Sequence, residues 1–126
     1  MKYHDYHLDS YEVFDRGESI TFNLVYGYSG EETDKSTVNF KGVSLYHIIN
    51  TSGAIITDIV EISLESLLSE VSNEITEWSR MYRIRNWKSA IASYLLHLQS
   101  NSFKAWEITS AIGFYGFIIA KEISSD

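Results

Sequence analysis

The chain has 126 residues, of which 44% are hydrophobic and 21% charged, and its formal net charge is −7. This size and composition are typical of one globular domain with its own apolar core, so we expect a single domain over residues 1–126. The absence of cysteine excludes disulfides and thiolate chemistry, and the negative charge argues against binding to nucleic acid.

The first half of the chain has the period of β-strands. The clearest segment is Ser19–Tyr26, where apolar and polar residues alternate as they do in a half-buried strand. Gly17, within residues 15–18, favours a tight turn before it. The five predicted strands are residues 7–14, 19–26, 37–41, 43–49 and 55–62. Residues 50–53 are predicted to form a turn between the last two.

A helical period follows. Apolar residues at positions 64, 67, 68, 71, 75 and 78 form one stripe of an amphipathic helix. Ser63 is a suitable N-cap for this helix. A second helix is predicted over residues 87–99, with Asn86 as its cap.

The last block returns to strands. Residues 103–109 and 114–121 are predicted to form a hairpin that turns at residues 110–113. Strands followed by helices and again by strands predict an α+β domain. We expect an antiparallel or mixed sheet with two helices packed on one face, in the order βββββ-αα-ββ.

Four aromatic residues are concentrated in the predicted hairpin. Tyr115 and Phe117 should share one face of the sheet, whereas Phe114 should lie on the other. Together with Trp106, these rings cannot all enter one core. If one face is exposed to water, they become candidates for an interface. A homodimer, or a larger homo-oligomer, that buries this hairpin is therefore one hypothesis for the protein.

Acidic side chains are the main candidates for a binding surface. Glu70, Glu74 and Glu77 lie on one flank of the first predicted helix, where their like charges oppose helix stability by about 0.2–0.5 kcal/mol per contact. A solvated helix face explains them equally well. The alternative is a landing site for a basic protein partner, to which the loop residues Glu31, Glu32 and Asp34 could add.

Motifs for catalysis are missing. The sequence has no Gly-x-Ser-x-Gly elbow and no glycine-rich phosphate loop, so no catalytic residue, cofactor or enzymatic activity is expected. Asp5, His7 and Asp9 would share one face of a strand, which leaves a small metal protein or enzyme as the weakest alternative. No metal site is expected.

The expected compartment is the cytoplasm. No stretch approaches 18 apolar residues and the first five residues contain no apolar run, so neither a membrane-spanning helix nor a signal peptide is expected. The lack of cysteine agrees with a reducing compartment.

Four segments resemble a family of small bacterial α+β proteins, some of which are described as toxin-immunity proteins. They are DYHLDSYEV at residues 5–13, FKGV at 40–43, IITDIVE at 55–61 and GFYGF at 113–117. The resemblance implies a non-enzymatic protein whose partner is a cognate toxin domain, and it supplies no catalytic residues. Our leading hypothesis is therefore an immunity-type protein that neutralises a basic toxin by direct binding.

Overall fold

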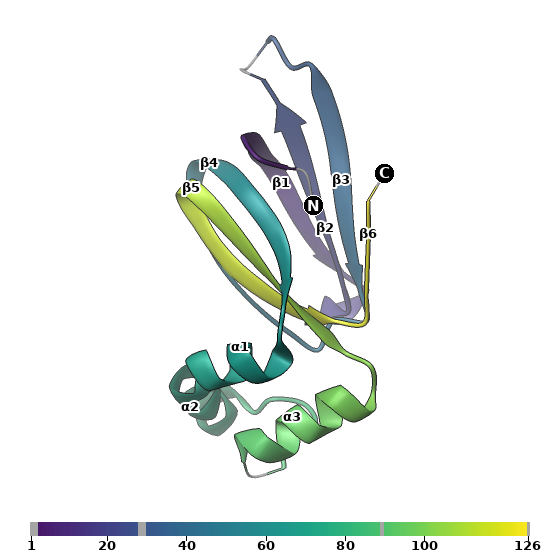
Figure 1. The fold of residues 1–126 in the computed structure, drawn as a ribbon, viewed down its shortest axis with the longest axis vertical. Coiled ribbons are helices and arrows are strands. Elements are labelled where there is room, and N and C mark those ends of the chain that lie inside the picture. The colour runs from purple at the N-terminus through teal and green to yellow at the C-terminus, as the bar shows by residue number, and fades with distance from the viewer. Residues whose placement is uncertain (1–2, 28–29, 89, 126) are drawn as a thin grey trace.

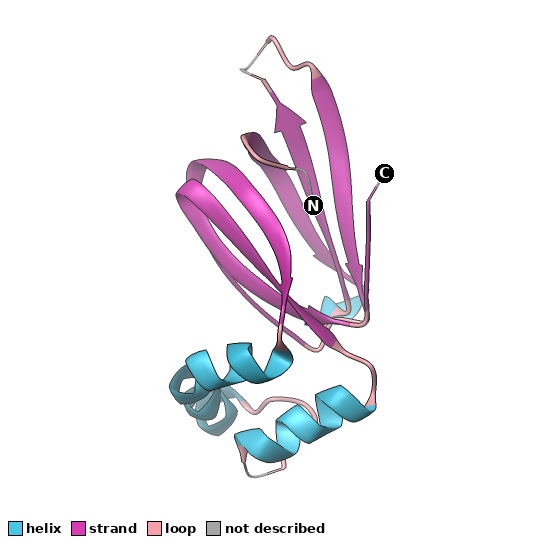
Figure 2. Ribbon diagram, in the orientation of Figure 1, coloured by secondary structure: helices cyan, strands magenta, loops and turns pink. Residues whose placement is uncertain are grey.

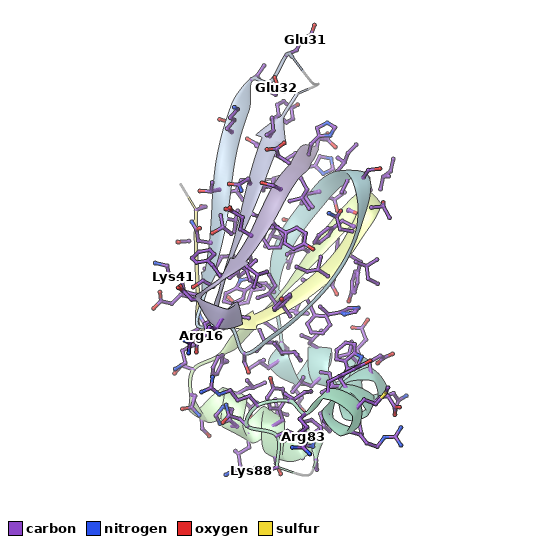
Figure 3. The ribbon with its side chains drawn as sticks, turned by 180° about the vertical axis from the view of Figure 1, so that it is seen from behind. Arg16, Glu31, Glu32, Lys41, Arg83 and Lys88 are labelled. Carbon is purple, nitrogen blue, oxygen red and sulfur yellow. The ribbon has the colours of Figure 1, made fainter. Side chains whose placement is uncertain are left out.

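The computed structural model describes residues 3–27, 30–88 and 90–125, shown from the front in Figure 1 and from behind in Figure 3. Six strands of this described part form one antiparallel sheet in the order β5-β4-β1-β2-β3-β6. The strands are β1 Tyr6–Phe14, β2 Ser19–Tyr26, β3 Asp34–Lys41, β4 Leu45–Ile62, β5 Lys104–Ala120 and β6 Glu122–Ser125. The helices are α1 Leu64–Glu70, α2 Ser72–Tyr82 and α3 Ile91–Ser100, with a 3-10 turn, η1, at Asp15–Gly17.

The predicted α+β class with an antiparallel sheet is confirmed, and the predicted order is matched only roughly. The described elements run ββββ-ααα-ββ (Figure 2). The strand Ser19–Tyr26 has the predicted bounds, because its alternating apolar side chains face a core on one side only.

The two long strands β4 and β5 replace four shorter predicted strands, residues 43–49, 55–62, 103–109 and 114–121. The predicted turns at residues 50–53 and 110–113 are wrong, since both segments lie inside strands that pair with each other. The pairing passes from Asn50 opposite Phe114 to Ile55 opposite Ile112, which leaves residues 51–54 opposite Gly113. Turn-forming residue types here produce bulges that bend a continuous ribbon.

Ser110 stabilises this bend. Its hydroxyl accepts a hydrogen bond from the Phe114 amide at 3.0 Å and donates one to the Phe114 carbonyl. Residues 110–113 have the composition of a hairpin tip because serine makes the same contacts in tight turns.

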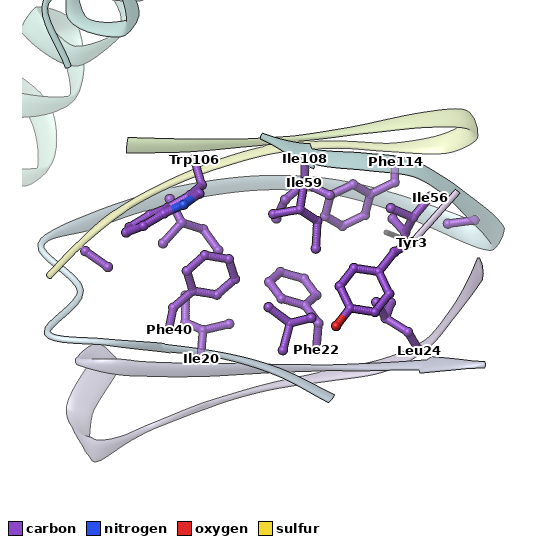
Figure 4. Close-up of a cluster of buried hydrophobic side chains, with 14 of the residues drawn as sticks. Tyr3, Ile20, Phe22, Leu24, Phe40, Ile56, Ile59, Trp106, Ile108 and Phe114 are labelled. Atoms are coloured by element: carbon purple, nitrogen blue, oxygen red, sulfur yellow. The ribbon is translucent and has the colours of Figure 1, made fainter. Parts of the chain in front are cut away.

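The sheet curls so that its two halves face each other across an apolar core (Figures 1 and 4). Strands β2 and β3 contribute one side of this core, with Phe22 and Phe40 almost fully buried. Ribbon β4–β5 contributes the other, with Trp106 and Phe114 packed edge-on against Phe40 and Phe22. Edge-to-face ring packing of this kind adds to the burial energy.

A second core lies where the helices pack on the outer face of the ribbon. It contains Phe117 and Ile119 of β5 together with Leu67, Ile75 and other buried residues of the helices. The predicted division of the aromatic residues between two faces is confirmed, because Phe114 lies in the first core and Phe117 and Tyr115 in the second. These rings pack inside the chain, so a homo-oligomer would have to use other surfaces.

The helical region differs from its prediction in two ways. The single predicted helix is divided at Val71, whose φ of −106° and ψ of 20° separate α1 from α2. No glycine or proline occurs there, so the periodic pattern gives no sign of the break. Asn86 is not the cap of the last helix, because it has φ 66° in the preceding loop and α3 begins after Ala90. Residue 89 of that predicted helix lies outside the described residues.

The ribbon's bend offers a matched test of the register. Gly53 and Gly113 both have positive φ, at 77° and 81°, but only at Gly113 would a Cβ meet another atom, Thr51 Oγ1 at 2.6 Å. We expect Gly53→Ala to cost about 1 kcal/mol from backbone strain alone. Gly113→Ala should cost about 2–3 kcal/mol, because strain and the clash add. Urea denaturation of both variants measures the difference, and equal costs would contradict the observed pairing.

Tyr94 should make the stability of the protein depend on alkaline pH. Its ring is fully buried and its hydroxyl lies 2.8 Å from that of Ser44. Burial raises the pKa of Tyr94 above its ordinary value, although the Ser44 hydrogen bond opposes this. The stabilising effect is therefore complete below about pH 10, the pKa of an unfolded tyrosine, and is lost as the pH rises further.

We expect the free energy of unfolding to fall less steeply above pH 10 in Tyr94→Phe than in the unmodified chain. The variant should also lose about 0.5–1.5 kcal/mol at neutral pH, since Ser44 loses its partner. Denaturation at a series of pH values measures both effects. Tyr82→Phe is the control because that side chain is 72% exposed. Parallel pH profiles for Tyr94→Phe and the unmodified chain would contradict the prediction.

Candidate functional site

The predicted acidic residues form two separate surfaces. Glu31 and Glu32 lie in the β2–β3 loop at one end of the molecule, whereas α1 and α2, which carry the other group, lie at the opposite end (Figures 1 and 3). We call Glu31, Glu32 and Asp34 the acidic loop, and Glu70, Glu74 and Glu77 the helix flank. The fold does not bring these two groups together.

The acidic loop is held against the start of β1. The Tyr6 hydroxyl donates a hydrogen bond to Asp34, and this contact is the main cause that raises the pKa of Tyr6. Backbone hydrogen bonds lower the pKa of Glu32, so its carboxylate is favoured in the charged form. Glu32 and Asp9 of β1 both line a hollow of about 410 Å³. The carboxylates of Asp9 and Glu32 thus share one surface with a single cation, Lys35, among the residues that line the hollow.

The helix flank is exposed and only partly paired. Glu77 forms an ion pair with Arg80 at 2.5 Å. Glu70 ends α1 and Glu74 lies in α2, so the like-charge contact expected between these two residues crosses the break at Val71. Glu74 and Glu77 are both in α2 and keep their i,i+3 spacing. Glu70 also acts on Tyr115. Burial is the main cause that raises the pKa of Tyr115, and the negative charges of Glu107 and Glu70 raise it further.

Strand β1 has an open edge although it lies in the middle of the sheet order. It pairs with β2 from His7 to Phe14 but with β4 only at Tyr6 and His7. Beyond that point the sheet parts, and within the described residues no strand pairs with β1 on this side. Residues 45–50 of β4 pair with β5. We call β1 residues 10–14 the open edge.

Apolar side chains lie along the open edge. Tyr11 and Val13 stand opposite the buried Phe22 and Ile20 of β2, so they point to the side of the sheet that carries the first core. They are nevertheless 37% and 38% exposed, and Phe14 on the other face is 47% exposed. This segment therefore presents both unpaired backbone groups and apolar side chains to solvent.

The usual protection of an edge strand is weak here. Sheet edges are normally blocked by lysine, proline, bulges or covering segments. The chain has no proline and β1 has no lysine, although a bulge lies at Asp9 between Leu8 and Ser10. Glu12 is the one charged residue within the open edge. The open edge was not predicted, because the pattern of residues 7–14 does not show on which side a strand is paired.

The alternative sites are not supported. Asp5 has φ 66° in the turn before β1, and the bulge at Asp9 interrupts the alternation, so Asp5, His7 and Asp9 do not share the predicted strand face. No group of three or more metal-binding side chains occurs among the residues that the structure describes. Over the same residues, no helix is long and apolar enough to cross a membrane.

Comparison with protein-family models, curated proteins and solved structures finds no match to this chain. Its own geometry is therefore the basis for assigning a function. The most distinctive feature of that geometry is the open edge of β1. It carries apolar side chains and a carboxylate, and no described strand pairs with it on the side away from β2.

Proposed function

We propose that this chain is a non-enzymatic binding protein that pairs an extended, basic segment of a partner protein with the open edge of β1. The observation that carries the proposal is the loss of pairing between β1 and β4 after His7. Addition of a strand would satisfy the exposed backbone groups and cover Tyr11 and Val13.

Charge favours a basic partner over a second copy of the chain. Glu12 lies on the edge itself, and Asp9 with the acidic loop extends the negative surface beyond its start. If two copies paired symmetrically through antiparallel residues 10–14, Glu12 would stand opposite its own copy, and like charges across strands are destabilising. A basic segment gains from the same carboxylates and from the net charge of −7, which steers it toward the protein.

In its more specific form, the proposal makes the partner a basic toxin domain that is neutralised by direct binding in the cytoplasm. The support for this form is the resemblance to immunity proteins and the acidic surface. A self-associating structural protein is the competing hypothesis, and sedimentation at high micromolar concentration distinguishes the two. A monomer agrees with the proposal, and a stable dimer contradicts it.

The first prediction concerns the open edge. A ten-residue peptide that alternates lysine with valine should bind the full chain and shift the backbone amide resonances of residues 10–14. Glu12→Lys should weaken this binding about tenfold, since one attraction becomes a repulsion worth about 1.4 kcal/mol in total. Val13→Lys should weaken it at least as much because edge lysines oppose strand addition.

The matched control is Glu122→Lys, which makes the same charge change on an exposed residue of β6 at the other side of the sheet. It should leave the peptide affinity almost unchanged at physiological salt, where distant charges are screened. Equal losses in Glu12→Lys and Glu122→Lys would mean that the peptide responds to net charge alone. That result, or amide shifts confined to other strands, would refute the proposed edge.

The second prediction concerns the helix flank, which stays a predicted contact surface for a folded basic partner. Reversal of Glu70, Glu74 and Glu77 to Lys should weaken the binding of such a domain and reduce its salt dependence. A cognate domain encoded beside the gene for this chain is the partner to titrate. Unchanged affinity would remove the helix flank from the binding surface.

A further inference from the structure

Two adjoining hollows occupy the end of the molecule that carries the helices. The first, of about 710 Å³, is lined by Arg16, Lys121, His97 and Phe103 among others, and we call it the basic pocket. The second, of about 400 Å³, is lined by His47, Trp78 and Tyr82 among others, and we call it the aromatic pocket. Arg85, Ser44, Leu45 and Tyr46 line both. The two hollows are therefore two halves of one site.

Backbone hydrogen bonds hold the walls of the basic pocket in place. The Val43 amide donates to the Glu18 carbonyl at 3.0 Å, which joins the β3–β4 loop to the β1–β2 turn. The Lys121 amide donates to the Lys41 carbonyl at 3.1 Å, which fixes the bend between β5 and β6. A site whose walls are preformed pays less ordering entropy when a ligand binds.

The basic pocket has a positive balance in a chain whose net charge is −7. Arg16, Arg85 and Lys121 face one carboxylate, Glu18, among its lining residues. Glu18 lies 4.0 Å from Arg85, and both side chains are mostly exposed. An exposed ion pair of this kind contributes little, so an incoming anion can replace Glu18 as the partner of Arg85.

Arg16 is held beside the pocket by the β1–β2 turn, in which Asp15 and Arg16 both have positive φ, at 53° and 57°. Two successive residues in the left-handed region are typical of a tight hairpin turn. Lys121 is also positioned, since its Nζ lies 5.1 Å from the centre of the Phe103 ring.

The aromatic pocket supplies the complementary apolar half. The rings of His47 and Trp78 lie 4.9 Å apart and form one wall. Tyr46 and Tyr82 are 37% and 72% exposed, so their rings are accessible to a ligand. Arg85 lines both pockets. A ligand whose anionic group binds Arg85 would therefore place its apolar body in the aromatic pocket.

We infer that the joined pockets bind a small molecule that carries a phosphate or carboxylate group on an aromatic body. Arginine guanidinium groups bind both kinds of anion in a two-pronged geometry, and exposed aromatic rings stack on the planar part. Each hollow falls within the range of about 300–1,000 Å³ that is typical of small-molecule sites. This site adjoins the end of the open edge at the β1–β2 turn, but its lining residues are different from those of the proposed partner site on β1.

The test is titration of the full chain with phenyl phosphate, benzoate and inorganic phosphate, followed by nuclear magnetic resonance. We expect saturable shifts of the Trp78 indole and the Arg85 amide, with dissociation constants of about 1 mM or below for the better aromatic anion. The stronger of phenyl phosphate and benzoate identifies the preferred anion. Inorganic phosphate should bind at least about fivefold more weakly than phenyl phosphate, since it lacks the ring.

Variants separate the two halves. Arg85→Gln and Arg16→Gln should each weaken phenyl phosphate about tenfold, whereas Lys88→Gln, on an exposed residue outside both pockets, should leave it unchanged. Tyr82→Ala should reduce the advantage of phenyl phosphate over inorganic phosphate. The inference is overturned if no probe gives saturable shifts at about 20 mM, or if Lys88→Gln matters as much as Arg85→Gln.

Discussion

The structure depends on the need of the β4–β5 ribbon to bury apolar side chains on both of its faces. Side chains alternate along a strand, so Phe114 and Ile118 of β5 point one way while Phe117 and Ile119 point the other. One layer cannot cover both sets. The curled half of the sheet covers the inner face, and the helices cover the outer face at one end (Figure 1). The helices leave part of the ribbon uncovered, since Ile49 and Ile112 are 54% and 60% exposed.

The open edge of β1 is a consequence of this two-layer arrangement. For the sheet to fold over its own core, β1 must leave β4 soon after the two strands meet, and they pair only at Tyr6 and His7. The backbone groups that β1 would otherwise satisfy in an ordinary sheet are left to solvent. The exposed side chains from Asp9 to Phe14 show that no other described element compensates. A fold constraint thus creates the surface on which binding is proposed.

The sequence predicts those features that depend on local periodicity and misses those that depend on pairing. The period of two gives the bounds of β2, and the helical stripe identifies Leu67, Leu68 and Ile75 as buried residues. The bends at residues 51–54 and 110–113 contain the same residue types as turns, and only their mutual pairing shows that the ribbon continues. The basic pocket could not be predicted either, because Arg16, Arg85 and Lys121 are brought together from three distant segments.

The net charge of −7 conceals a separation of charge that bears on both proposals. Glu31 and Glu32 lie at the end of the sheet away from the helices, whereas Arg83 and Lys88 lie at the helix end (Figure 3). The helix end also carries the helix flank, where Arg80 pairs with Glu77 of the same helix, α2. Charges screen one another over about 8–10 Å in physiological salt. A basic segment is therefore attracted to the start of the open edge, near Asp9 and the acidic loop, and a small anion to the basic pocket that follows Phe14 at the other end of the same edge.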